Sequence, residues 1–169
     1  MPTFPDATGA DDPRHQRIAA LARAYLEADY RWELGGDWDD LRIGLPAPGL
    51  EMAHAGATSF GFVAAWNPWS IERVEADNRE ADHALHQLLL ESGQPFRAAF
   101  ASAPNRSWRE PSWVVMGLPL QDFDALMRRF GQLGTLWWLP GEPVRLRMDA
   151  VRPPNFTDDA YIDWLQGLK

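Results

Sequence analysis

Apolar residues recur along this chain at two spacings, and the changes between them predict an alternation of helices and strands. From Asp12, a residue type that caps helices, to Leu26, apolar residues fall three or four apart and predict a helix. Between Tyr30 and Leu34 they alternate with polar residues, as in a half-buried strand. A glycine-containing break follows, and we expect a second short strand near residues 41–45 to complete a hairpin.

The middle of the chain continues this alternation. Ser59 to Trp66 is an almost wholly apolar run, which is typical of a central strand covered on both faces. Helical spacing then begins near Asp77 and stops at Gly93, a residue type that often ends helices. The elements predicted after this helix are strands near 96–100 and 113–118, a helix over 120–130, and a strand over 135–139.

The order strand, helix, strand, strand, helix, strand is that of ferredoxin-like folds. We therefore predict an α+β two-layer sandwich with a mostly antiparallel sheet and ferredoxin-like βαββαβ order, plus extra N- and C-terminal elements. A further strand is expected over 144–148, Pro153 and the proline after it should stop the sheet, and residues 158–168 should form a short helix. Residues 1–11 lack periodicity and predict a flexible N-terminus before a single domain over 12–169.

Composition and charge narrow the class of protein. The 169 residues are 46% hydrophobic and include 9 Trp, which indicates a globular chain able to bury a core. The absence of cysteine excludes disulfides, thiolate metal sites and a cysteine nucleophile. A net charge of -8 opposes binding to nucleic acid or to anionic membranes. We see neither a signal peptide nor an apolar run long enough to span a bilayer, so we expect a cytoplasmic protein.

The strongest candidate for a ligand site is the turn formed by Trp66, Asn67, Pro68 and Trp69 at the exit of the central strand. The carboxamide of Asn67 can orient a polar ligand group, while the indoles of Trp66 and Trp69 stack on a planar ring. The structural alternative is that Asn-Pro only starts a turn and the tryptophans pack in the core. Because nine indoles are difficult to bury in a small domain, we expect Trp66, Trp69 or Trp108 to line a cleft or contact a partner.

Glu110 is the best candidate for a general acid or base. It stands between Trp108 and Pro111, and apolar surroundings would raise the pKa of its carboxyl toward neutrality. Gln132 can donate a hydrogen bond into the same cleft. Structural alternatives remain open, with Glu110 paired to Arg109, Arg106 or a neighbouring backbone amide, and with Gln132 simply ending a helix.

Other catalytic and metal motifs are incomplete. His83 and His86 lie three apart, but on the side of their helix opposite its apolar stripe, so we expect both to be solvated. Ser112 lacks a nucleophile elbow, and no glycine-rich phosphate loop follows a strand. We expect no metal and no cofactor.

These segments together resemble a bacterial family of unknown function, domain-of-unknown-function family 3293. Its members carry an Ala-Trp-Asn-Pro segment, an Asn at the following helix start, a Glu-Pro-Ser segment and a Phe-Gly-Gln. The corresponding positions here are Ala65 to Pro68, Asn78, Glu110 to Ser112, and Phe130 to Gln132. The resemblance spans roughly Tyr30 to Met148, although Ala64 stands where a threonine is common. It implies one shared site, made of Asn67, Asn78, Glu110 and Gln132, and it implies no reaction.

Three functions fit this pattern. The leading hypothesis is a small-molecule-binding module whose cleft at the Trp66-Asn67-Pro68 turn holds a compact polar or planar ligand. The second is a hydrolase or transferase with Glu110 as general base and Asn67 polarising the substrate. The third is a protein-interaction or regulatory domain that uses exposed tryptophans and an acidic surface to bind a protein partner.

Overall fold

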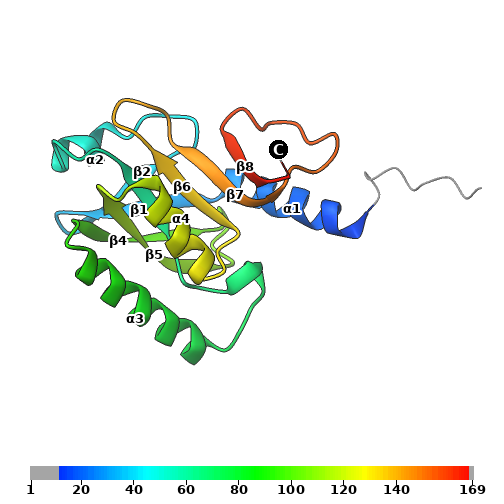
Figure 1. Ribbon diagram of the computed structural model, residues 1–169, viewed down its shortest axis with the longest axis horizontal. Coiled ribbons are helices and arrows are strands. Elements are labelled where there is room, and N and C mark those ends of the chain that lie inside the picture. The colour runs from blue at the N-terminus through cyan, green and yellow to red at the C-terminus, as the bar shows by residue number, and fades with distance from the viewer. Residues whose placement is uncertain (1–11, 168–169) are drawn as a thin grey trace, which may run out of the picture.

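An eight-stranded, mostly antiparallel sheet organises the computed structural model, which describes residues 12–167 (Figure 1). The α+β class predicted from the sequence is confirmed. In chain order the elements are α1 (Pro13–Glu27), β1 (Asp29–Leu34), β2 (Asp37–Leu41), α2 (Pro48–Ala53), β3 (Phe60–Val63), the short 3-10 turn η2 (Pro68–Ser70), α3 (Glu75–Ser92), β4 (Phe96–Ser102), β5 (Arg109–Met116), α4 (Leu120–Arg129), β6 (Gly134–Trp138), β7 (Arg145–Val151) and β8 (Ile162–Gln166). The predicted flexible segment 1–11 and residues 168–169 lie outside the described residues.

Helix α1 begins where the sequence predicted. The carboxylate of Asp12 accepts a hydrogen bond from the backbone N–H of Arg14 at 2.9 Å, as an N-cap does. The hairpin of β1 and β2 is also confirmed, but β2 ends at Leu41, where the predicted strand began. Gly35 and Gly36 both have positive φ and form a two-residue turn, so pairing restarts at once.

Strand β3 is central, as predicted. The sheet order is β2-β1-β4-β5-β3-β6-β7-β8, and each neighbouring pair is antiparallel except β7 with β8. Helix α3 connects β3 to β4 across the intervening β5, and α4 connects β5 to β6 across β3. Because β3 and β5 pair antiparallel, the end of β3 and the beginning of β5 lie at the same end of the two strands.

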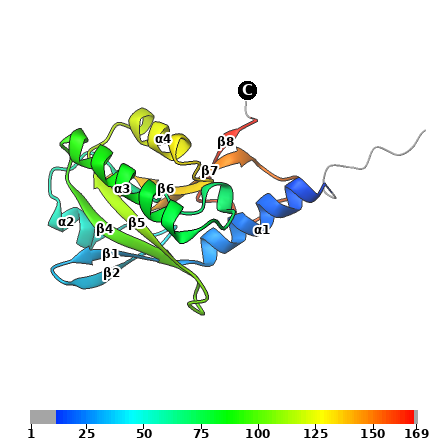
Figure 2. The same ribbon diagram turned by 90° about the horizontal axis from the view of Figure 1, so that it is seen from below.

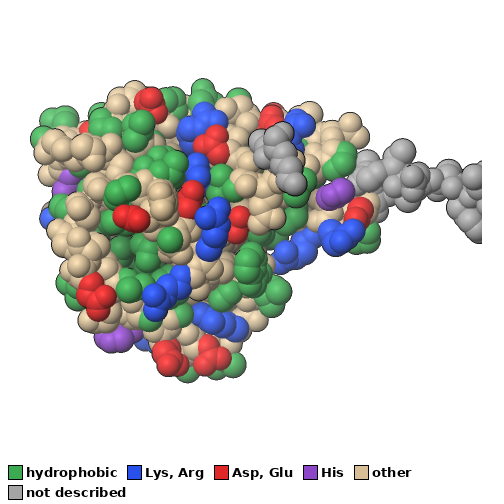
Figure 3. All heavy atoms as spheres, in the orientation of Figure 1, with side chains coloured by type: hydrophobic (Ala, Val, Ile, Leu, Met, Phe, Trp, Pro, Cys, Tyr) green, Lys and Arg blue, Asp and Glu red, His purple; other side chains and the backbone are tan. Residues whose placement is uncertain are grey.

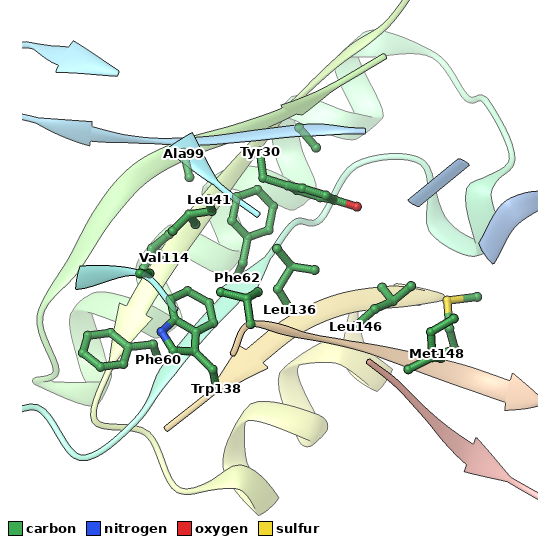
Figure 4. Close-up of a cluster of buried hydrophobic side chains, with 14 of the residues drawn as sticks. Tyr30, Leu41, Phe60, Phe62, Ala99, Val114, Leu136, Trp138, Leu146 and Met148 are labelled. Atoms are coloured by element: carbon green, nitrogen blue, oxygen red, sulfur yellow. The ribbon is translucent and has the colours of Figure 1, made fainter. Parts of the chain in front are cut away.

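Alternate residues of β3 face opposite sides of the sheet and enter two different buried clusters. Phe60 and Phe62 belong to the larger cluster, which includes residues of α1 and α2, while Val63 packs with residues of α3 and α4. Figure 2 shows α4 and α1 on opposite sides of β6 and β7. In the larger cluster Phe60 stacks on Trp138, with ring centroids 5.5 Å apart (Figure 4).

The smaller cluster requires a glycine in β3. A Cβ atom on Gly61 would lie 2.3 Å from the ring of Phe123, a contact that real structures do not tolerate. Phe123 of α4 is fully buried, so its ring has little room to retreat. The absence of a side chain at Gly61 therefore lets α4 pack directly on the central strand.

Strand β5 begins earlier than predicted, because it already includes Arg109. Pro111 lacks an N–H and would weaken a strand paired on both sides. It faces Phe100 of β4, whereas pairing with β3 starts only at Trp113, so the missing donor leaves no gap in the β3 ladder. Glu110 thus lies within the strand rather than just before it. Helix α3 also starts earlier than predicted, at Glu75, and its N-cap residue Val74 makes no side-chain cap.

The C-terminal prediction was wrong. Residues 158–168 were expected to form a helix after the sheet had ended at Pro153, but Ile162–Gln166 form β8, parallel to β7. Ile162 and Trp164 are buried while Asp163 between them is half-buried, which is the two-residue period of a strand. The Asp163 carboxylate binds the Arg145 guanidinium of β7 through two hydrogen bonds of 3.0 Å.

Candidate functional site

The chain that leaves β3 makes a turn with an unusual backbone. Asn67, Trp69 and Ser70 have φ values of 44°, 59° and 57°, in the left-handed region that favours glycine. Each such residue costs about 1–3 kcal/mol, and Asn tolerates the region better than Trp. The turn therefore needs contacts that hold it, and the structure provides several.

Asn67 and Asn78 hold each other directly. The backbone N–H of Asn67 donates to Oδ1 of Asn78 at 2.9 Å, and Nδ2 of Asn78 donates to Oδ1 of Asn67 at 2.8 Å. Arg73 closes the group, since its Nε donates to Oδ1 of Asn78 at 2.7 Å and its backbone N–H to Oδ1 of Asn67 at 3.2 Å. Asn78 is only 2% exposed, so it positions the turn and presents no surface to a ligand.

Two elements far away in the chain also fix the turn. From α1, Arg17 donates to the backbone carbonyl of Trp69 at 2.6 Å, and the hydroxyls of Tyr25 and Ser70 share a hydrogen bond of 2.5 Å. After α4, the carbonyl of Gly131 accepts from the N–H of Trp69 at 2.7 Å. Burial raises the pKa of Tyr25 to about 12, so its hydroxyl stays protonated at neutral pH.

Glu110 reaches this turn from β5. Nδ2 of Asn67 lies 3.5 Å from Oε1 of Glu110, at the outer limit of a hydrogen bond. Burial raises the pKa of Glu110 from 4.5 to about 7, and the hydrogen bond from Asn67 opposes this shift only in part. The carboxyl is therefore close to half ionised at neutral pH, as its apolar sequence neighbours predicted.

The Glu110 carboxyl lines two adjoining cavities. The outer cavity has a volume of about 190 Å³, and the inner one, of about 30 Å³, has room for little more than a water molecule or a methyl group. Tyr25 and Trp108 line both cavities and form their aromatic walls. The remaining residues around the outer cavity are Leu21, Ala24, Asn67, Ser70 and Glu72.

The structure brings together most of the residues that the sequence grouped. Asn78, Asn67 and Glu110 form one chain of side-chain contacts. Gln132 lines the inner cavity and donates from Nε2 to the carbonyls of Trp66 and Phe130, at 3.1 Å each. Gln132 therefore helps to fix the backbone of the turn at Trp66.

The tryptophans of the turn lie elsewhere. Trp66 is absent from the lining of both Glu110 cavities, and Trp69 lines a separate pocket at the end of α4. Trp108 and Tyr25 occupy the places that the sequence assigned to Trp66 and Trp69. Trp108, a candidate for a cleft, is 38% exposed.

Sequence reasoning missed Tyr25 and Arg73. Tyr25 was read as part of the buried stripe of α1, and nothing in the sequence connects that helix to a turn 45 residues later. Arg73 stands in the loop before α3, where an arginine is unremarkable. The one available signal was its place between two motif asparagines.

The histidine prediction holds only in part. His83 is exposed as expected, but His86 is partly buried and stacks on Trp113, with ring centroids 4.9 Å apart and an interplanar angle of 20°. Between residues 12 and 167, no group of three or more His, Cys, Asp or Glu side chains is placed to hold a metal ion. In the same part of the chain, every helix is too short or too polar to cross a membrane.

Comparison with known families finds one match. Residues 63–134 match the model of a family described as protein of unknown function (DUF3293). Over this segment the chain is similar to the DUF3293 family. The matched segment contains Asn67, Asn78, Glu110 and Gln132, and it is shorter than the span from Tyr30 to Met148 over which we saw the resemblance.

The DUF3293 segment excludes α1, so Tyr25 comes from outside the matched residues although it lines the Glu110 cavities. A search of curated proteins finds no match. A search of solved structures finds none either.

Proposed function

We propose that this protein binds a small polar or planar ligand in the outer cavity beside Glu110, and that the ligand offers a hydrogen-bond donor or a positive charge to this carboxyl. The observation that carries the proposal is the incomplete hydrogen bonding of a largely buried carboxyl. Among the described residues, only Asn67 donates to it, at 3.5 Å. A buried carboxyl normally accepts several closer hydrogen bonds.

The composition of the cavity favours a donor or a cation over an anion. Glu72 adds a second carboxylate, and within the described chain no lysine or arginine lines this cavity. The rings of Tyr25 and Trp108 provide flat apolar walls, which stabilise planar groups and cations alike. An amine or amidine on a compact planar body would match these three features.

Asn67 is oriented for this role. Its Oδ1 already accepts from Asn78 and Arg73, so Nδ2 is the end of the carboxamide that faces Glu110. An amide nitrogen carries two N–H groups, and the second is available to a ligand acceptor. The network around Asn78 therefore presents a fixed donor beside the Glu110 carboxyl.

A thermal-shift screen of amines, amino acids, nucleosides and sugars tests the proposal. A ligand at about 100 times its dissociation constant should add roughly 2.7 kcal/mol to the free energy of unfolding, a shift of several degrees in melting temperature. We expect the stabilising compounds to lose their effect on Glu110→Gln and to keep it on Glu91→Gln, a matched change at an exposed position of α3. Equal shifts for wild type and Glu110→Gln would place the ligand elsewhere and contradict the proposal.

A second function, catalysis by Glu110 as a general base of a hydrolase or transferase, is favoured by the position of its pKa near 7. A base works best when its pKa lies close to the working pH. Asn67 would then polarise the substrate. Incubating each stabilising compound with the protein and following it by NMR separates the two functions, because a binding module leaves the compound unchanged.

We also infer that β3 to β6, with α3 and α4, form a two-layer ferredoxin-like unit within the larger sheet. These four strands lie in the order β4-β5-β3-β6, and both helices pack in the same buried cluster on one face. The β1-β2 hairpin and β7-β8 extend the unit at its two edges, and residues of α1 and α2 pack on its other face.

A further inference from the structure

A second pocket, distinct from the Glu110 cavities, lies where η2 packs on the end of α4. Its volume is about 400 Å³, and Trp69, Arg73, Arg128, Arg129 and Phe130 form most of its wall. No aspartate or glutamate lines it among the residues that the structure describes. A pocket walled by three arginines is notable in a chain with a net charge of -8. Figure 3 shows basic side chains gathered over the end of α4 and the loop before α3.

The indole of Trp69 is exposed, but hydrogen bonds fix the backbone of this residue. It is 49% exposed, although its backbone N–H and carbonyl are both hydrogen-bonded, to Gly131 and Arg17. Gly131 makes room for the ring, since a Cβ there would lie 3.0 Å from Cβ of Pro68 and 3.3 Å from Nε1 of Trp69. The fold thus keeps a large aromatic surface in a strained backbone conformation and open to solvent, which is typical of ligand clamps rather than of cores.

The charges of the arginines around this pocket are not neutralised. Arg128 and Arg129 form no ion pair with any residue between 12 and 167, and the guanidinium of Arg129 lies 6.0 Å from the centre of the Phe130 ring. Among the described residues, the guanidinium of Arg73 donates hydrogen bonds to two neutral groups, the side chain of Asn78 and the carbonyl of Ala65, and to no carboxylate. No carboxylate of the described residues therefore pairs with these three guanidinium groups.

The dipole of α4 is the simplest alternative explanation, because cations are favoured in the last turn of a helix. It accounts for Arg128 and Arg129. It does not account for the exposed indole of Trp69 against the same space. Arg73, which fixes the Asn67 turn, adds a third guanidinium to this space from another segment. A ligand would use the indole and the arginines together.

We propose that this pocket binds an aromatic anion, with its ring stacked on Trp69 and its carboxylate or phosphate group paired with Arg128 and Arg129. Guanidinium groups bind such oxyanions through paired, charge-assisted hydrogen bonds, and planar rings stack on indoles. The outer Glu110 cavity is lined by two acidic side chains and this pocket by three arginines, so the two sites select ligands of opposite charge. This site does not depend on the function proposed above.

Isothermal titration with phenyl phosphate, phenol and inorganic phosphate tests the proposal on the wild-type protein. We expect phenyl phosphate to bind at least tenfold more tightly than either of the other two compounds. Equal affinity for inorganic phosphate would overturn the stacking role of Trp69. Equal affinity for phenol would overturn the pairing with arginine, and no binding of phenyl phosphate would overturn the site.

Substitutions test whether phenyl phosphate binds in the arginine pocket. Arg128→Gln combined with Arg129→Gln should weaken phenyl phosphate binding tenfold or more, and Trp69→Leu should reduce it to the affinity of inorganic phosphate. The matched control combines Arg14→Gln with Arg79→Gln, which removes the same charge from two exposed arginines paired with Asp12 and Glu75. An equal loss in the control would reduce the effect to net charge and contradict the site. Glu110→Gln should leave phenyl phosphate binding unchanged, which separates failure of this site from failure of the Glu110 cavity.

Discussion

The side chains of Asn67 and Glu110 stand 43 residues apart in the chain, yet Nδ2 of Asn67 lies 3.5 Å from Oε1 of Glu110. Asn67 follows β3 and Glu110 lies near the start of β5, and these strands pair antiparallel in the middle of the sheet. Two motifs of the segment that matches DUF3293 are thereby brought into contact. The polar groups of this candidate site are fixed by Asn78 and Arg73, and its aromatic walls are Tyr25 and Trp108.

The raised pKa of Glu110 makes stability depend on pH. Below pH 4.5 the carboxyl is protonated in both the folded and the unfolded chain. Between pH 4.5 and about 7 the unfolded chain loses this proton first, so the free energy of unfolding falls as pH rises. The full effect is about 3 kcal/mol, and Glu110→Gln should remove this part of the slope. Urea denaturation of both proteins at pH 5 and pH 8 measures how much the free energy of unfolding falls between the two pH values. An equal fall in wild type and Glu110→Gln would contradict the assigned pKa.

Asn78→Ala should destabilise the fold strongly. It removes the hydrogen bonds that Asn78 makes with the N–H and Oδ1 of Asn67 and with the guanidinium of Arg73, which we expect to cost roughly 2–4 kcal/mol. Asn105→Ala serves as control, because Asn105 makes a single exposed hydrogen bond to the N–H of Ser107. Chemical denaturation of both variants should show a clear difference, and similar losses would mean that the Asn78 network adds little.

Substitutions of Asn67 separate backbone strain from side-chain contacts. Asn67→Ala and Asn67→Gly both lose the hydrogen bonds to Asn78, Arg73 and Glu110, but only glycine accepts a φ of 44° without strain. Asn67→Gly should therefore be more stable than Asn67→Ala by about 1 kcal/mol. The comparison needs only two melting curves, and an alanine variant as stable as the glycine variant would show that the turn relaxes.

Gly61→Ala should be among the most damaging small changes in the chain. Its new methyl group would overlap the buried ring of Phe123, and overpacking of this kind costs roughly 3 kcal/mol or more. Phe123→Leu should recover part of the loss in the double variant, because leucine leaves the space that the ring edge fills. A double-mutant cycle measures this coupling, and purely additive effects would place the strain elsewhere.

The local pattern of residues was sufficient to predict many of the element boundaries, the central strand and the raised pKa of Glu110. The Asp12 cap determines where α1 starts, and Gly93, with φ of 71°, ends α3 as predicted. The apolar run that contains β3 indicated a central strand, because a strand covered on both faces needs apolar side chains at every position. The tendency of Glu110 toward a raised pKa could also be read from its apolar neighbours. These properties depend on residues close together in the chain.

Tertiary contacts decided the formation of β8, the environment of His86 and the walls of the two pockets. Whether residues 162–166 form a strand depends on β7 being there to pair with them, and His86 is covered because Phe96 of β4 and Trp113 of β5 pack against it. The walls of the Glu110 cavity come from α1 and from the segment before β5, and the strained turn directs Trp69 to a different pocket. The spacing of apolar residues along the chain does not predict such contacts, because they arise from the burial of side chains that are distant in sequence. The sequence alone therefore determined most of the elements and the residues Asn67, Asn78, Glu110 and Gln132, and the packed fold determined β8, the walls of the cavity and the neighbouring arginine pocket.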